Sequence, residues 1–200
     1  MTTQDQINSL KAALKETGRP SSDFDLNPSV TLPEGRKLRN AAVLIPIATY
    51  SGQTEVILTK RASSLKHHPG QIAFPGGKQD ETDSNLVETA LRESWEEIGL
   101  PVESAEILGA LPSHETVTGF NVTPILAHIR KPFRIVPERG EVDEVFAAPL
   151  PHLMSSENYV VQYRFWRGEK RKYYTVPYGP YYIWGATARI LRALADRVEK

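Results

Sequence analysis

Three glutamates near the middle of the chain, Glu93, Glu96 and Glu97, have the type and spacing to bind a metal ion. Positions i, i+3 and i+4 share one face of a helix. Like charges at this spacing destabilise a helix, and carboxylates in the last turn also oppose the helix dipole. A hard divalent cation such as Mg²⁺ takes oxygen ligands and would remove both penalties. The alternative is a solvated acidic face on an amphipathic helix.

The residues around these glutamates predict the helix that must position them. On a wheel of about 100° per residue, four large apolar residues fall together, opposite the carboxylates. We expect this core face to consist of Val87, Leu91, Trp95 and Ile98. Asp83 or Ser84 is the expected N-cap, and Arg92 is expected to offset part of the acidic charge.

The whole stretch from Gly76 to Leu100 resembles the Nudix box, G-x5-E-x7-R-E-U-x-E-E-x-G-U, where U is a bulky aliphatic residue. It departs from the box in three respects. Counting from Gly77, the first acidic residue is Asp83 rather than Glu, one extra residue separates it from Arg92, and Ser94 occupies the first U position. The resemblance implies an α/β fold, a Nudix-type α/β/α sandwich with a mixed sheet. It also implies hydrolysis of a pyrophosphate linked to a nucleoside.

The preceding stretch, LTKRASSLKHHPGQIAFPGG, resembles the signature of coenzyme A pyrophosphatases, L-L-T-x-R-[SA]-x3-R-x3-G-x3-F-P-G-G. Ile57 replaces the first Leu of that signature, and Lys66 replaces its second Arg. Lys keeps the charge but cannot make the bidentate phosphate contact of Arg. The subfamily resemblance implies cleavage of coenzyme A, and also of acyl derivatives of it, to 3′,5′-ADP and 4′-phosphopantetheine.

The resemblance also implies roles for individual residues. Glu93 and Glu97 are the expected primary ligands of Mg²⁺ or Mn²⁺, and Glu96 is a third ligand or reaches the metal through water. Nudix enzymes often supply a further glutamate as base or extra ligand from the region of residues 141–150, where Glu141 is favoured over Glu144. The expected catalytic residues are therefore Glu93, Glu96 and Glu141.

Substrate binding is expected from the signature and from one later loop. Arg61 could simply end a strand in solvent, but with the signature around it we expect it to face phosphate. The segment 118–120 either touches the nucleotide or pantetheine, or is an ordinary hairpin loop. The expected substrate-binding residues are Arg61, Lys66, Gly76, Gly77 and Phe120.

Three other functions are kept as alternatives. A Nudix-like module could bind a nucleotide without cleaving it, although a pure binder needs no three carboxylates facing a phosphate. The substrate could instead be ADP-ribose, NADH or a nucleotide sugar. The adjacent His67 and His68 could suggest zinc, but neighbouring side chains point apart and no other His lies near in sequence.

The composition excludes several classes of partner. The 200 residues include 24 Lys plus Arg and 24 Asp plus Glu, so no basic excess indicates a nucleic-acid or membrane partner. No apolar run reaches the roughly 20 residues of a membrane-spanning helix. Neither a signal peptide nor a peroxisomal motif is evident. The expected partner is a small nucleotide, and the expected location is the cytoplasm.

The pattern of apolar residues predicts the remaining organisation. Residues 1–37 are expected to form a helix over 4–17 and an extended loop over 18–37, ahead of the Nudix domain over 38–200. The helix either packs on that domain or makes a homodimer contact. Strands are expected over 39–49, 54–61, 72–74, 106–111, 120–129 and 141–150, followed by a hairpin of 159–166 with 172–176 and a helix over 183–198. Pro124 suggests an edge strand or a bulge.

Overall fold

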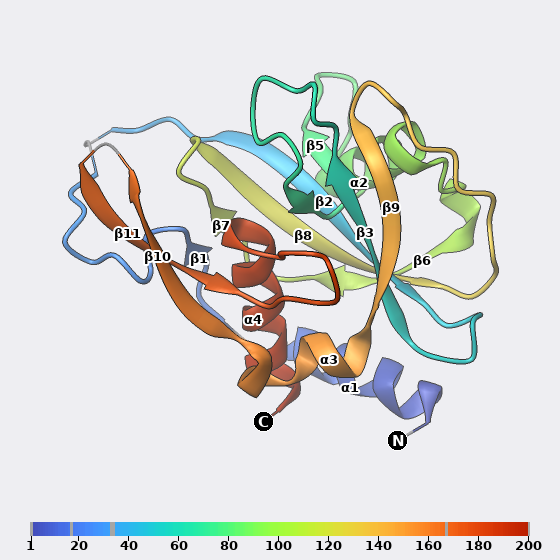
Figure 1. Ribbon diagram of the computed structural model, residues 1–200. Helices are drawn as coiled ribbons and strands as arrows, with labels where there is room; N and C mark the ends of the chain where they lie inside the picture. Colours follow the sequence, from blue (N-terminus) through green and yellow to red (C-terminus); the bar gives the residue numbers. More distant parts are fainter. Residues whose placement is uncertain (1, 17, 33–34, 167, 200) are drawn as a thin grey trace.

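The computed structural model describes residues 2–16, 18–32, 35–166 and 168–199. In this part of the chain a mixed β-sheet lies between helices, which is the expected α/β/α architecture (Figure 1). The helices are α1 (Thr3–Lys15), α2 (Leu86–Ile98), α3 (Leu150–Met154) and α4 (Gly185–Val198). Pro33 of the expected loop and Arg167 of the expected hairpin turn lie outside the described residues.

The main sheet follows the order β1-β7-β8-β2-β3-β4, with β5 paired to β2, β6 to β8 and β9 to β3. Its central pair, β2 with β8, is parallel, whereas β2 with β3 and β3 with β9 are antiparallel. The strands are β1 (Ser21–Ser22), β2 (Arg39–Ala48), β3 (Glu55–Arg61), β4 (Ile72–Ala73), β5 (Gly76–Lys78), β6 (Ala105–Ala110), β7 (His114–Glu115), β8 (Phe120–Ile129) and β9 (Val142–Pro149).

A separate antiparallel hairpin, β10 (Val160–Trp166) with β11 (Glu169–Thr175), projects from the sheet beside α4 (Figure 1). Its two strands confirm the expected hairpin, although the second strand begins three residues earlier than expected. The loop expected over 18–37 contains the short strand β1, which pairs with β7 from the segment between β6 and β8.

Alternation along β2 separates two cores. Ile45 and Ile47 face the core shared with α1, α3 and α4, whereas Ala42 and Leu44 face the core under α2. Successive side chains of a strand point to opposite faces, so one apolar strand supplies both layers. This is why the sequence of β2 is a continuous apolar run instead of an alternating one.

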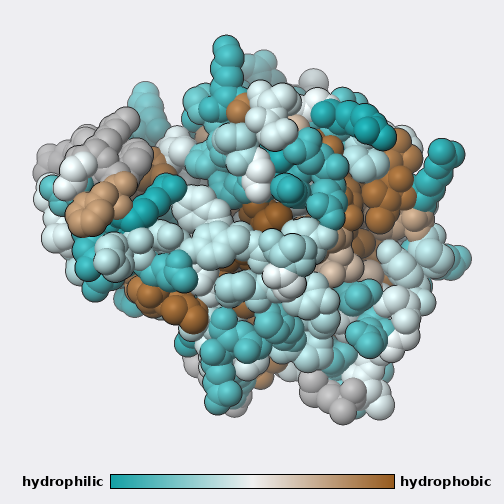
Figure 2. All heavy atoms as spheres, in the orientation of Figure 1, coloured by the Kyte–Doolittle hydropathy of each residue, from teal (hydrophilic) through white to brown (hydrophobic). Residues whose placement is uncertain are grey.

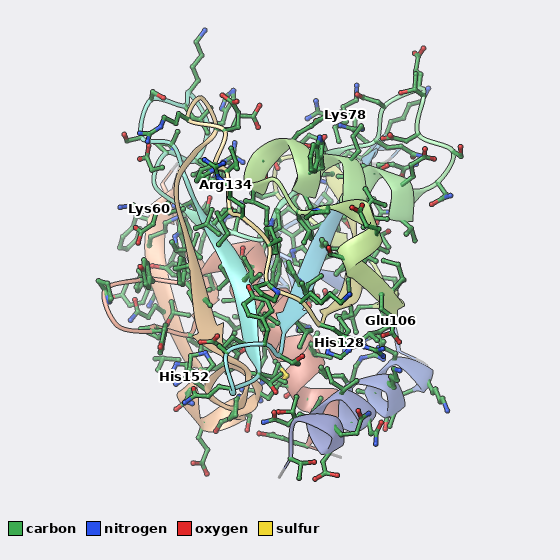
Figure 3. All side chains as sticks on the ribbon, turned by 90° about the vertical axis from the view of Figure 1, so that its right-hand side faces the viewer. Lys60, Lys78, Glu106, His128, Arg134 and His152 are labelled. Carbon is green, nitrogen blue, oxygen red and sulfur yellow. The ribbon has the colours of Figure 1, made fainter. Side chains whose placement is uncertain are left out.

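The N-terminal helix packs on its own chain. Leu10 is 1% exposed and belongs to the core on the α4 side. On the outer side of α1, Lys11 pairs with Glu106 at 3.4 Å. Figure 3 shows Glu106 near His128 beside this helix, and their side chains approach to 3.7 Å. The boundary at residue 38 and the homodimer stay predictions.

Two expectations about individual residues are wrong. Strand β8 is central, with β2 on one side and β6 and β7 on the other, so Pro124 does not mark an edge. The Pro124 carbonyl accepts the Leu111 N–H at 2.9 Å, just where β6 has ended and β7 has not begun. The missing N–H of proline points to the same side as its carbonyl, so it faces the break between those strands.

The second error concerns the core face of α2. Ile98 is buried, and Val87 and Leu91 pack on the core, but Trp95 is 54% exposed. Glu97 is buried in its place, at 4% exposure. The wheel failed because it groups apolar side chains alone and cannot include a buried carboxylate such as Glu97 in the core face. The buried face of the helix is centred between the apolar residues and the carboxylates.

None of the helices in the described residues has the length and apolar character needed to cross a membrane. The face of the molecule drawn in Figure 2 is mostly hydrophilic, with apolar residues in scattered patches.

Candidate active site

Helix α2 begins at a side-chain cap that sets its position. The Asn85 side chain accepts hydrogen bonds from two backbone N–H groups of the first turn, each at 3.0 Å. The expected cap, Asp83 or Ser84, is therefore wrong. Asn is as good a cap as Asp, which leaves the Asp83 carboxylate available for another contact.

That contact is with Arg92. The Arg92 guanidinium donates to the Asp83 carboxylate from Nε at 2.9 Å and from Nη2 at 2.8 Å. The Thr89 hydroxyl at 3.0 Å and the Asp80 backbone N–H at 2.9 Å also donate to it. These bonds, above all those from Arg92, hold the pKa of Asp83 well below its usual range. The acidic residue at this position of the motif fixes the arginine of the helix.

Arg92 also binds the acidic face of its own helix. Its Nη1 donates to Glu93 and to Glu96, each at 3.0 Å, and its Nη2 donates to the Lys78 carbonyl at 3.3 Å. The expected offset of charge is therefore present as direct ion pairs. Burial nevertheless raises the pKa of Glu93, because its carboxylate lies between the helix and β5.

Glu97 is the most deeply buried carboxylate of the site. Its Oε2 accepts the backbone N–H of Gly76 at 3.2 Å. Burial is the main cause that raises the pKa of Glu97, to about 8; the charges of Glu93 and Glu141 act in the same direction, and the Gly76 N–H and Arg61 oppose the rise. Residues of the box, of the signature and of the loop before β9 therefore act on one carboxylate.

Two glycines allow this close approach of helix and strand. Gly76 has φ of +151°, and a Cβ there would collide with the Ala42 carbonyl of β2. A Cβ on Gly77 would lie 2.5 Å from the Glu93 carboxyl carbon. Only glycine leaves space for a carboxylate directly against the backbone here. Both predicted glycines therefore border the carboxylates.

The position of Arg61 follows from the alternation of β3 and from an irregularity at its end. Ile57 packs in the core under α2, and Arg61, four residues later, lies on the same face of the strand. The pairing of β3 with β9 shifts register between Lys60 and Arg61. The extra residue, Asp143, belongs to β9, so the alternation of β3 continues to Arg61. Such bulges are frequent beside active sites.

Of the two glutamates considered near β9, Glu141 lies nearer the carboxylate cluster. Its carbonyl accepts the Ala62 N–H at 2.8 Å, which joins its loop to the residue after Arg61. Glu144 instead accepts a hydrogen bond from the Tyr181 hydroxyl at 2.5 Å and lines an outer cleft. The preference for Glu141 agrees with this arrangement, but its role in catalysis stays a prediction.

Two predicted substrate-binding residues lie outside the wall of the cavity that Gly76 and Arg61 line. Lys66 is exposed in the loop after β3. The Phe120 ring is covered by the Arg39 guanidinium, whose central carbon lies 4.0 Å from the ring centroid. Thr118, by contrast, lines the cavity. The role predicted for Lys66 rests on the signature, and that predicted for Phe120 rests on the segment 118–120.

A cavity of about 390 Å³ opens beside this cluster and extends between the sheet, α4 and the hairpin. Gly76 and Arg61 line it, together with the loop over residues 116–118. Its remaining wall includes Arg164, Arg171, Tyr173 and Trp184. These four residues were not predicted from the sequence. The hairpin and α4 carry no motif, and only the fold places them beside the cavity.

The carboxylates fit a hard divalent cation by the chemistry of their oxygens. Gly77 also leaves the space that a Glu93 ligand needs. The described residues hold no group of three His, Cys, Asp or Glu side chains already gathered as a metal site. In the structure Arg92 forms ion pairs with Glu93 and Glu96.

Comparisons with known proteins show the family and the fold. Residues 38–168 match the model of the NUDIX domain. "Uncharacterized Nudix hydrolase NudL" of Pectobacterium atrosepticum is 37% identical over 188 residues, which are 90% of this chain and 97% of that protein. The protein of the same name from an Enterobacter species is 43% identical over 160 residues, covering 80% and 83%. The MutT protein of Methanosarcina mazei Go1 shares the fold, with a TM-score of 0.52, 20% identity and coverage of 84% of this chain and 99% of that chain.

The ion pair between Asp83 and Arg92 generates a stability prediction. Asp83→Asn removes the charge that accepts two guanidinium bonds in a buried place. We expect the free energy of unfolding to fall by about 2–3 kcal/mol, since hydrogen bonds to charged groups contribute about that much. Urea denaturation followed by circular dichroism measures the change.

Asp80→Asn is the matched control. Asp80 is 58% exposed and lies 3.8 Å from the same Arg92 nitrogen group. An exposed pair contributes about 0–1 kcal/mol. Equal losses of unfolding free energy in the two variants would show that the contact between Asp83 and Arg92 stabilises the fold no more than an exposed ion pair does.

Proposed function

The chain belongs to the Nudix family and is a Nudix hydrolase, and from this premise we propose that it cleaves coenzyme A to 3′,5′-ADP and 4′-phosphopantetheine. The proposal includes acyl derivatives of coenzyme A. One observation carries it: Arg61, from the coenzyme A signature, lines a cavity together with Gly76, whose backbone N–H binds the carboxylate of Glu97 from the box. The reacting pyrophosphate would lie beside these residues, with the rest of the substrate in the cavity.

We assign the roles as follows. A bound Mg²⁺ or Mn²⁺ would neutralise pyrophosphate charge and lower the pKa of a water molecule. Glu93 and Glu97 would hold the cation as primary ligands, and Glu96 would be a third ligand. Glu141 would accept the proton of the attacking water. Its exposed side chain and its coupling to Glu93 and Glu97 support that role.

Arg61 would hold the phosphate oxygens that the cation leaves uncompensated. A guanidinium can donate two parallel hydrogen bonds to a phosphate. Lys66 would add positive charge from its loop. A homodimer and a cytoplasmic location stay predictions.

A comparison of coenzyme A with other nucleotide substrates tests the proposal directly. We expect kcat/KM for coenzyme A to exceed that for ADP-ribose and NADH in the presence of Mg²⁺ or Mn²⁺, with 3′,5′-ADP as a product. Chromatography of the products measures this. A preference for ADP-ribose or NADH would instead favour a different Nudix pyrophosphatase, and binding without turnover of any of them would favour a non-catalytic module.

Glu97→Gln tests the ligand assignment. The amide keeps the shape and an oxygen for the Gly76 N–H, but it lacks the charge that a cation needs. We expect turnover to fall by roughly a hundredfold or more, about 2.7 kcal/mol of transition-state stabilisation, while the melting temperature stays near that of the parent. Glu103→Gln, at an exposed position of the loop after α2, is the control. Near-parental activity of Glu97→Gln would refute the assignment.

Arg61→Lys tests the phosphate contact. Lysine keeps the charge but lacks the planar fork. We expect kcat/KM to fall by roughly tenfold or more, about 1.4 kcal/mol, with a larger loss for Arg61→Ala and little change in melting temperature. Lys60→Arg, at the neighbouring position on the other face of β3, is a control for local packing. Unchanged kinetics with a lower melting temperature would make Arg61 a structural residue.

A further inference from the structure

His68 has an unusual backbone conformation in the loop between β3 and β4. Its φ is +56°, and among the described residues it is the only non-glycine residue with a positive φ. A side chain disfavours this left-handed region, and backbone strain of this kind is concentrated at functional sites. The coenzyme A signature leaves this position open, between Lys66 and Gly70. The resemblance therefore assigns His68 no role.

Backbone hydrogen bonds fix this loop directly beside Arg61. The Arg61 N–H donates to the Gln71 carbonyl at 3.0 Å, and the Arg61 carbonyl accepts the Gly70 N–H at 3.1 Å. The His68 carbonyl accepts the Gln71 N–H at 3.2 Å, which closes the turn. The turn that carries His68 is thereby attached to the residue proposed to bind phosphate.

The His68 side chain faces two hollows at once. It lines the cavity of about 390 Å³ that Arg61 and Gly76 also line. It also lines the outer cleft, of about 580 Å³, which Glu144 borders. Because this exposed side chain belongs to both walls, it lies where the two hollows meet. A ligand held by Arg61 at the cavity wall would therefore have His68 as a neighbour.

The chemical state of the His68 ring suits a phosphate oxygen. Partial burial is the main cause that lowers the pKa of His68, and the charge of Arg61 acts in the same direction. The imidazole is therefore neutral at neutral pH and adds no second cation beside Arg61. The Gln71 side chain forms a hydrogen bond with the ring. Because a Gln amide can donate or accept, the other ring nitrogen can carry the N–H donor.

We propose that His68 is a substrate-binding residue that donates a hydrogen bond to the pyrophosphate held by Arg61. This inference rests on the proposed function, because the pyrophosphate is that of the nucleotide substrate. Arg61 supplies a charge from the end of β3, and His68 supplies a neutral donor from the adjacent loop. The strained backbone conformation is the one in which the His68 ring reaches the junction of the two hollows.

The two adjacent histidines give a matched comparison. His68→Asn removes the imidazole, while asparagine still tolerates a positive φ. We expect kcat/KM for coenzyme A in the presence of Mg²⁺ to fall by about tenfold, since hydrogen bonds to a charged phosphate are strong. His67→Asn is the control, because His67 is exposed and lines neither the cavity nor the outer cleft. The kcat/KM of this control should equal that of the parent.

His68→Gly separates a role in binding from a role in folding. Glycine adopts a positive φ without strain, so the melting temperature should not fall, whereas kcat/KM should fall as in His68→Asn. A structural histidine would give the reverse, a lower melting temperature with parental kinetics. That result would overturn the proposal, as would parental kinetics in both variants or a loss of activity that accompanies a lower melting temperature in both.

Binding of inorganic pyrophosphate separates this inference from the proposed function. By calorimetry with Mg²⁺, His68→Asn is expected to bind pyrophosphate about tenfold more weakly than the parent, and His67→Asn as tightly as the parent. Equal binding by all three proteins, or no binding by the parent, would refute the contact. If the parent does not hydrolyse coenzyme A, the proposed function fails, and this binding comparison alone decides the role of His68.

Discussion

The bidentate contact between Arg92 and Asp83 is the interaction on which the rest of the site depends. One guanidinium joins the loop before α2 to the helix and to the end of β5, through Asp83, Glu93, Glu96 and the Lys78 carbonyl. Without it, neighbouring carboxylates would repel one another and turn into solvent. Because Asp83 is buried and fully hydrogen-bonded, the arginine cannot swing away, and the carboxylates keep a common direction.

Burying the Glu97 carboxylate costs free energy that the same residue would not cost on a solvent-exposed helix face. A carboxylate taken out of water is destabilised unless it is paired or hydrogen-bonded. Here the Gly76 N–H supplies a single hydrogen bond, and the remaining penalty is evident in the raised pKa of Glu97. A buried carboxylate with a raised pKa is typical of functional sites, since a purely structural role would be better served by an apolar residue. The glycines of β5 serve other neighbours of that strand: a Cβ on Gly77 would displace the Glu93 carboxylate, and a Cβ on Gly76 would collide with β2.

The sequence predicted the architecture and the local part of the site because both depend on short-range patterns. The apolar run of β2 and the alternation in the hairpin were sufficient for those strands. The orientation of α2 was wrong because a helical wheel scores Trp95 as core and Glu97 as surface, and only tertiary packing against Gly76 reverses them. Pro124 misled for a related reason: proline excludes a hydrogen bond on one side of a strand, and the sequence cannot show that the neighbouring strand is interrupted there.

The residues of the cavity wall could not be predicted from the sequence, because elements distant in the chain contribute them. The carboxylates, glycines and Arg61 lie within one continuous stretch, so a motif can describe them. Arg164 and Trp184 come from elements that follow the sheet by many residues, and they reach the cavity only because α4 packs on the sheet face opposite α2. The motif residues and the rest of the cavity wall thus come from different parts of the chain. Arg92 contacts the loop before α2, its own helix and β5, and none of these contacts involves the hairpin, so a change in the hairpin would alter the cavity wall and leave that ion-pair network in place.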